Sequence, residues 1–190
     1  LTSGKSYSNV FHANGGSASF SVMANTLRGV YGTDVLLATA NSFTGSVLQA
    51  DYNKKMAASM IMPNGLMSRQ RTMTGAELKE TVRAFVEGCK GGFVPFNRGS
   101  LPVVSGIAVE VKEAGGSYTL TGITRNGQPL RDDDTVTVTC LAAEKQMEAL
   151  LASESGTPLD GDTWVKNRWR DHVSGGGAAL AEPENYMTLR

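Results

Sequence analysis

A chain of 190 residues, 41% hydrophobic and 19% charged, is long enough to bury one substantial core and lacks the composition of a disordered protein. Its 18 lysines and arginines balance its 18 aspartates and glutamates, so overall charge does not favour nucleic acid or an anionic membrane as a partner. No apolar run approaches the roughly 20 residues that span a bilayer, and no signal peptide stands at the start. We therefore expect one globular domain without a membrane span, with any export signal outside this sequence.

The first half of the chain predicts helices alternating with strands. Residues 1–18 are rich in serine, glycine and asparagine and are expected to form a connecting segment. Apolar side chains at helical spacing predict a helix over 20–30, and a continuous apolar run predicts a buried strand over 34–39. A shorter helix is expected over 53–60 and another strand over 66–73.

The run from Met73 to Arg83 predicts a direct change from strand to helix. Thr74 and Glu77 have the spacing of a capping box, in which the hydroxyl accepts from the third helical amide and the carboxylate accepts from the cap residue's own amide. Apolar residues then recur at helical spacing, and Gly88 suits the left-handed position just past the helix end. On their own these residues indicate an amphipathic helix packed on a core.

The second half is richer in strands. Alternating apolar and polar residues predict strands over 107–111, 118–123 and 135–140, and Asn126-Gly127 predicts a tight hairpin turn. The remaining expected elements are helices over 142–152 and 163–173 and an edge strand over 186–189. This mixture predicts the class α+β, and periodicity alone supports nothing finer.

Few residues indicate catalysis. A two-metal phosphoesterase needs several His, Asp and Asn ligands converging on its cations, whereas this chain has His12 and His172, far apart and most simply surface or helix-face residues. Cys89 and Cys140 form no Cys-x-x-Cys pair and neither require nor exclude a disulfide, so two buried thiols are the simpler interpretation. The run 132–134 of aspartates lacks the ligand spacing of a calcium loop and indicates a solvated turn.

Four blocks of sequence occur in a recognisable order. Residues 32–42 read GTDVLLATANS, Pro63-Asn64-Gly65 precedes the Thr74 run at a fixed distance, residues 101–107 read LPVVSGI, and residues 126–134 read NGQPLRDDD. These blocks resemble the elements aDvalxNxGgiR, PFGN with LTGxxLxxxLE, FLqvSGl and nGkpldpdx of the C-terminal domain of the 5′-nucleotidase family. That family comprises secreted metallophosphoesterases, including UDP-sugar hydrolases and 2′,3′-cyclic-nucleotide phosphodiesterases, and this chain resembles a divergent member.

The resemblance implies a four-layer α/β/β/α fold with mixed sheets, in which residues 1–18 are the remnant of an interdomain linker and 19–190 form the domain. The two divalent metals of the family sit in a separate N-terminal domain, so no cofactor is expected in this chain. The implied partners are that N-terminal metallophosphoesterase domain, on the same polypeptide, and a nucleotide or nucleoside ligand. An extracellular, cell-surface or periplasmic location is expected.

In the family, the C-terminal domain recognises substrate, with arginines that grip the phosphate and two aromatic rings that sandwich the base. By resemblance, Asn41 matches the asparagine of the NxGgiR loop, and Asn64 stands where PFGN has phenylalanine. Phe43, Arg69 and Arg71 could supply a ring or a charge from new positions, although a packed phenylalanine and exposed strand arginines are the simpler interpretation. These five residues form the expected substrate-binding set, and no catalytic residue is expected.

The departures from the family pattern leave two functions open. Ser46 occupies the position of the loop arginine, Leu101 replaces a phenylalanine, and residues 140–147 lack the segment NDFLxxGGDGF that carries the second stacking ring. One function is a substrate-recognition domain whose pocket has diverged. The alternative is a degenerate structural or interaction module that no longer binds nucleotides, which the missing arginine and rings favour. Metal-ligand motifs upstream in the full gene product would favour the first.

Overall fold

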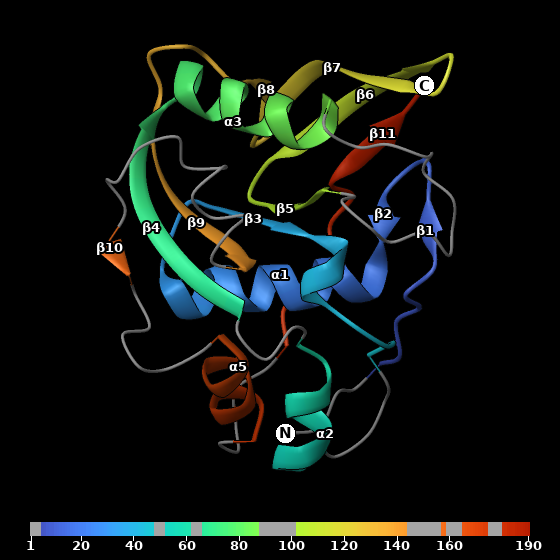
Figure 1. The fold of residues 1–190 in the computed structure, drawn as a ribbon, viewed down its shortest axis with the longest axis vertical. Helices are drawn as coiled ribbons and strands as arrows, with labels where there is room; N and C mark the ends of the chain where they lie inside the picture. The colour runs from blue at the N-terminus through green and yellow to red at the C-terminus, as the bar shows by residue number, and fades with distance from the viewer. Residues whose placement is uncertain are drawn as a thin grey trace.

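The computed structural model describes residues 5–47, 52–61, 66–87, 102–143, 157–158, 165–174 and 180–190. Its helices are α1 (Ala18–Tyr31), the 3-10 helix η1 (Ala40–Ser42), α2 (Lys54–Ser59), α3 (Gly75–Glu87) and α5 (Val165–Ser174). Its strands are β1 (Phe11–His12), β2 (Gly16–Ser17), β3 (Val35–Thr39), β4 (Leu66–Thr74), β5 (Pro102–Ser105), β6 (Ala108–Ala114), β7 (Ser117–Arg125), β8 (Gln128–Pro129), β9 (Thr135–Ala143), β10 (Thr157–Pro158) and β11 (Met187–Leu189). The described chain is thus a mixed fold of helices and strands (Figure 1).

The larger sheet has five strands in the order β10-β4-β9-β3-β5. It is a mixed sheet, because β3 runs parallel to β9 while the other neighbours are antiparallel. The ladder between β4 and β9 extends without interruption from the pair Leu66 and Ala143 to the pair Thr74 and Thr135. Every residue of β3 is buried, as expected of an apolar strand covered on both faces.

The smaller sheet has the order β11-β6-β7-β8 and is also mixed, since β11 runs parallel to β6. A register shift between Glu110 and Val111 marks a bulge in the β6–β7 pair, which increases local twist. Between β7 and β8, Asn126 and Gly127 both have positive φ, 52° and 74°. The predicted tight turn is confirmed, because a two-residue hairpin of this kind needs positive φ at both positions.

Helices flank the two sheets (Figure 1). α1 packs on β3 and β5 of the larger sheet, and α3 packs on β7 of the smaller one. α2 and α5 contact each other at the far end of the molecule from α3. The hydroxyl of Ser17 caps α1 by accepting from the Phe20 amide at 3.3 Å, and Gly32 ends it with φ 67°, a left-handed conformation that favours glycine.

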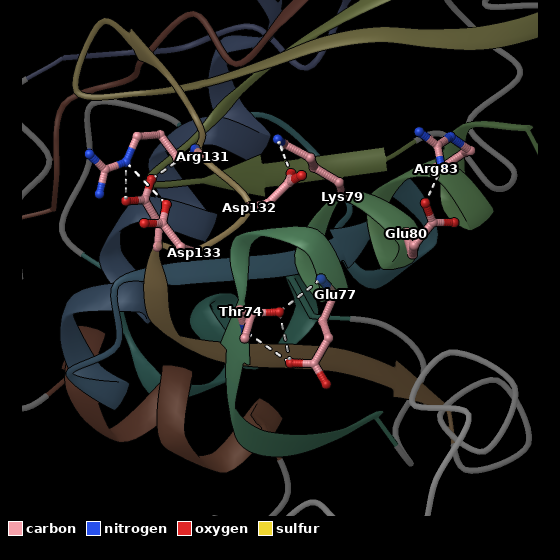
Figure 2. A network of polar contacts seen from close by, with 9 residues as sticks. Thr74, Glu77, Lys79, Glu80, Arg83, Arg131, Asp132 and Asp133 are labelled. Atoms are coloured by element: carbon pink, nitrogen blue, oxygen red, sulfur yellow. Dashed lines mark hydrogen bonds and ion pairs between the residues drawn. The ribbon is translucent and has the colours of Figure 1, made fainter.

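The start of α3 has the capping box that the sequence predicts (Figure 2). The Glu77 amide donates to Thr74 Oγ1 at 3.2 Å, and the Thr74 amide donates to Glu77 Oε2 at 2.8 Å. Arg71, three residues earlier on β4, pairs with the other Glu77 oxygen at 3.0 Å. Backbone hydrogen bonding, with Arg71 and the Thr74 hydroxyl contributing, holds the pKa of the Glu77 carboxyl below its usual value.

The 131–134 turn packs on the same end of α3. The Gly75 amide donates to the Asp134 carbonyl at 2.7 Å, and the Ala76 amide donates to the Asp132 carbonyl at 3.1 Å. A Cβ atom on Gly75 would lie 1.8 Å from the Arg131 carbonyl oxygen, so only glycine allows this approach. The predicted solvated turn is confirmed, with Lys79 paired to Asp132 at its rim (Figure 2).

Most sequence-predicted elements lie within a few residues of those observed, including the edge strand at the C-terminal end. The predicted helix over 142–152 is wrong at its start, because Ala142 and Ala143 continue β9 opposite Met67 and Leu66. Helix propensity favoured those alanines as helical, but the ladder with β4 supplies cross-strand hydrogen bonds that outweigh a weak local preference. Residues 144–152 lie outside the described part of the chain, as does Cys89. Cys140 is a buried free thiol.

Two glycine substitutions test the packing of the turn on α3. Alanine is the better helix former by about 0.5–1 kcal/mol, so Gly29→Ala in α1, where a Cβ meets no atom within 4 Å, is expected to stabilise the protein. Gly75→Ala is expected to destabilise it by about 1–3 kcal/mol, because the new methyl group collides with backbone. Urea denaturation of both variants measures whether each substitution raises or lowers the free energy of unfolding. Equal effects at the two positions would contradict the packing described for the turn.

Candidate functional site

The structure describes four of the five residues that the sequence proposed for substrate binding. Asn41 lies exposed in η1, just past the end of β3. Phe43 follows it, but its side chain is 2% exposed and packs on Phe20 with ring centroids 5.8 Å apart. The packed interpretation of Phe43 is therefore confirmed, since a ring in this position has no free face for a base. Asn64 lies outside the described residues.

Arg69 and Arg71 lie on β4, two strands away from Asn41. The ladder places Arg69 opposite Cys140, which pairs with Leu37 in the middle of β3, and places Arg71 level with Val35 at its start. The two ends of β3 are about 13 Å apart at roughly 3.3 Å per residue, and Asn41 lies beyond the far end. Among the described members of the set, Arg69 and Arg71 therefore lie two strands away from Asn41 and on a different level along β3.

Arg69 and Arg71 lie on the face of the larger sheet that points away from α1. Residues paired across strands point to the same face, so Arg69 and Arg71 share a face with Cys140 and Leu37. The neighbouring residue Leu36 pairs with Ser105, which contacts α1, so the arginines face away from α1. Burial raises the pKa of the Cys140 thiol to about 12, which keeps this residue neutral and unreactive.

A different polar cluster lies at the opposite end of β3, around Asp34. Its Oδ2 accepts from the Thr137 amide at 2.8 Å and from the Thr137 hydroxyl at 2.9 Å, both on β9. Its Oδ1 pairs with Arg125 Nη2 at 2.7 Å, at the end of β7. One carboxylate therefore binds both sheets.

Arg28 completes the cluster from the last turn of α1. Its Nε donates to Ser105 Oγ at 2.8 Å, and its Nη1 donates to the Asp34 carbonyl oxygen at 3.4 Å. Ser105 in turn donates to Asn25 Oδ1, so the guanidinium is held through a buried hydrogen-bond chain. Gly106, with φ 83°, lets the chain after β5 approach Asp34, because a Cβ there would lie 2.0 Å from the Asp34 carbonyl oxygen.

A cavity of about 360 Å³ opens beside these residues. Five segments line it: the end of α1, the entry to β3, the β5–β6 connection, the β7–β8 hairpin, and residues 184–185 near the C-terminal end. A second cavity of about 720 Å³ shares Arg125 and Asn126 with it. The cavity thus brings together polar side chains from segments far apart in the sequence, which supply convergent polar groups of the kind that orient a bound small molecule.

The cluster around Asp34 contains two positively charged side chains and one negatively charged side chain. The hydrogen bonds from Thr137, together with the nearby Arg125 and Arg28 guanidiniums, hold the pKa of Asp34 below its usual value although partial burial opposes them. Asp34 therefore stays ionised and offsets one of the two arginines. The pair Arg28 and Arg125 keeps one positive charge in excess of Asp34 beside the cavity.

Sequence reasoning missed this site for an identifiable reason. Asp34 stood in the block that resembles the family's strand, and Asn126-Gly127 was identified as a turn, but neither was connected to the other. Arg125 lies 91 residues from Asp34, and Thr137 lies 103 residues away. A polar residue at the entry of an otherwise apolar strand was the one local signal, because such a carboxylate needs a partner.

Comparison with known proteins rests on the fold. No family model matches the sequence, and no curated protein matches it. The structure is similar to the 5′-nucleotidase precursor of Thermus thermophilus (TM-score 0.72, 14% identity), covering 100% of this chain and 39% of that one. It is also similar to the NAD nucleotidase of Haemophilus influenzae (TM-score 0.66, 15% identity, 100% and 37%). A sulfate thiohydrolase of Thermus thermophilus matches at TM-score 0.67 and 11% identity, with 100% and 34% covered.

Two of these structural neighbours are nucleotidases, and one of the two is a 5′-nucleotidase precursor, so the fold that the sequence resemblance implied is confirmed at the level of mixed helices and mixed sheets. The chain spans between a third and two fifths of the length of those structures. The described residues contain no group of three or more His, Cys, Asp or Glu side chains that could hold a metal ion. In that same part of the chain, no helix is long and apolar enough to cross a membrane.

The Asp34 carboxylate makes stability depend on acidity. Because its folded pKa lies below the unfolded value of about 4, its contribution is full above pH 4 and is lost as pH falls through the folded pKa. Asp34→Asn is expected to cost about 1 kcal/mol near neutral pH, allowing for solvent screening of a partly exposed group. Below the folded pKa the difference from the unmodified protein should shrink.

Chemical denaturation at several pH values between neutral pH and pH 3 measures how the difference in unfolding free energy between Asp34→Asn and the unmodified protein decreases as pH falls. The matched control is Asp133→Asn, since that side chain is 78% exposed beside Arg131. Its stability curve is expected to run parallel to that of the unmodified protein. A parallel curve for Asp34→Asn would show that the Asp34 contacts do not stabilise the fold.

Proposed function

We propose that this chain is the substrate-side, non-catalytic domain of a nucleotidase-like phosphoester hydrolase, with the two-metal domain on the same polypeptide. The observation that carries the proposal is the coverage: all of this chain matches the neighbours, yet it accounts for 34–39% of their lengths. The order of the sequence blocks supports a C-terminal position, a four-layer arrangement and a linker over residues 1–18. On this proposal, secretion to the periplasm, cell surface or medium follows the family.

The chemistry of the described residues is consistent with a supporting role. Two divalent metals would need several carboxylate, imidazole and amide ligands from the partner domain, where they would activate water and neutralise the phosphate. His172 lies on α5, and burial alone lowers its pKa. His12 lies exposed on β1. Neither histidine has the surroundings of a metal ligand among the described residues.

A second function, the degenerate structural or interaction module, is favoured by one specific observation. Phe43 is in the core, and Arg71 is engaged with Glu77, so two of the proposed ligand contacts are already used by the fold. The pocket of the family would then have lost its ring and its charge. The two functions share the fold and differ in whether nucleotide is recognised.

The full gene product distinguishes the two functions. If the first is right, it contains upstream metal-ligand motifs and hydrolyses nucleotides in the presence of manganese, and deleting residues 19–190 raises KM more than it lowers kcat. If the second is right, these motifs are absent, or the deletion leaves KM unchanged. The sequence upstream of Leu1 is therefore the first observation to make.

The purified chain by itself is expected to hydrolyse no phosphate ester, because its residues supply no two-metal ligand set. Release of phosphate from adenosine monophosphate, measured with added manganese or zinc, tests this. Turnover well above a buffer control, and removed by a chelator, would contradict it.

Simple nucleotides are expected to bind this chain weakly. Losing a charged phosphate contact costs about 1.5–3 kcal/mol, and losing an aromatic base contact about 0.5–1.5 kcal/mol more. A micromolar site is worth about 8 kcal/mol, so losses of about 2–4.5 kcal/mol in total weaken the dissociation constant by roughly 30- to 2,000-fold, from micromolar into the range from tens of micromolar to millimolar. Calorimetric titration with adenosine and adenosine monophosphate measures it. A micromolar constant that Arg69→Ala abolishes would show that the pocket has been rebuilt.

A further inference from the structure

The arginines beside the Asp34 cavity are held in fixed positions. Arg28 is anchored through Nε and Nη1, and Arg125 through Nη2, each to an acceptor of the protein. Both line the same cavity, and among the described residues no hydrogen bond or ion pair engages the remaining N–H groups of Arg28 Nη2 and of Arg125 Nε and Nη1. Anchored guanidiniums with free donors bind a planar carboxylate with little loss of side-chain entropy.

An opposite charge lines the same cavity. Glu184 belongs to the C-terminal segment, its side chain is exposed, and its backbone is fixed by Ser21, which accepts from its amide and donates to its carbonyl oxygen. No ion pair within the described structure joins Glu184 to Arg28 or Arg125. Besides the paired Asp34 and Arg125, the cavity therefore carries a second carboxylate, on Glu184, that forms no ion pair with either arginine among the described contacts.

The size and charge of the cavity select a class of ligand. Its volume of about 360 Å³ lies near the lower end of the roughly 300–1,000 Å³ typical of small-molecule sites. Arg28 and Arg125 exceed Asp34 by one positive charge, which suits one carboxylate better than a phosphate dianion. Glu184 suits an ammonium group, and Ile107 adds an apolar surface for a short side chain.

We propose that this cavity is a binding site for a small zwitterionic α-amino acid. Arg28 and Arg125 hold the carboxylate, and Glu184 accepts hydrogen bonds from the ammonium group. The site lies at the opposite end of β3 from the loop that the nucleotidase resemblance indicates, so it does not depend on the proposed function.

Titration of the purified chain, followed by backbone amide NMR, tests this proposal. L-alanine is expected to shift the amide signals of Gly106 and Gly127 at millimolar concentration, with propionate binding more weakly because it lacks the ammonium group. Arg28→Lys and Arg125→Lys should each weaken alanine binding at least about tenfold, the loss expected for one charge-assisted contact. Glu184→Gln should reduce alanine affinity to that of propionate. Each variant's amide spectrum shows whether it is folded.

Matched controls are Arg83→Lys on α3 and Glu113→Gln on β6, which lie outside the cavity and should leave binding unchanged. Absence of saturable shifts with L-alanine would overturn the proposal. Tighter binding of inorganic phosphate would also overturn it, because the two arginines would then prefer a phosphate to a carboxylate. Equal binding of propionate and alanine would overturn it as well, because that result would remove the role given to Glu184. If both arginine variants fail to fold, Glu184→Gln still tests the proposal. This variant is expected to fold, because the Glu184 side chain has no partner among the described contacts.

Discussion

The architecture depends on the Asp34 carboxylate, the group at which the two sheets and the first helix meet. One oxygen binds Thr137 in the larger sheet and the other binds Arg125 in the smaller, while the backbone carbonyl of the same residue accepts from Arg28. A lone carboxylate this close to a buried strand would be costly, and its full complement of donors offsets that cost. Removing the Asp34 carboxylate leaves Thr137 and Arg125 without their common acceptor.

Glycine makes the junction geometrically possible. Gly32 turns the chain from α1 into β3 through a left-handed conformation, and Gly106 lets the β5–β6 connection pass close to the Asp34 backbone. The cavity exists because five segments reach this junction without filling it. The other end of β3 is different, since Phe43 and Phe20 fill the space against the loop. Side chains therefore fill the space around the C-terminal end of β3, whereas a cavity lies beside its N-terminal end.

Identities of 11–15% with full coverage show how little of a sequence a fold requires. Burial pattern, caps and turns specify the architecture, whereas ligand recognition depends on a few side chains that can change without disturbing it. Arg71 illustrates the point, because it is used to orient Glu77 in the capping box of α3. Shared architecture thus leaves the ligand to be determined from the residues themselves.

The sequence alone determined the features that arise from local physics. The capping box of Thr74 and Glu77, the positive-φ turn at Asn126-Gly127 and the apolar run of β3 each involve residues close in the chain, so their patterns are readable directly. Only the tertiary structure decided which side chains meet. Asp34, Arg125 and Thr137 come together across 91 and 103 residues, and Ala142 joins β9 because β4 pairs with it. Such contacts depend on sheet order and register, which no local pattern encodes.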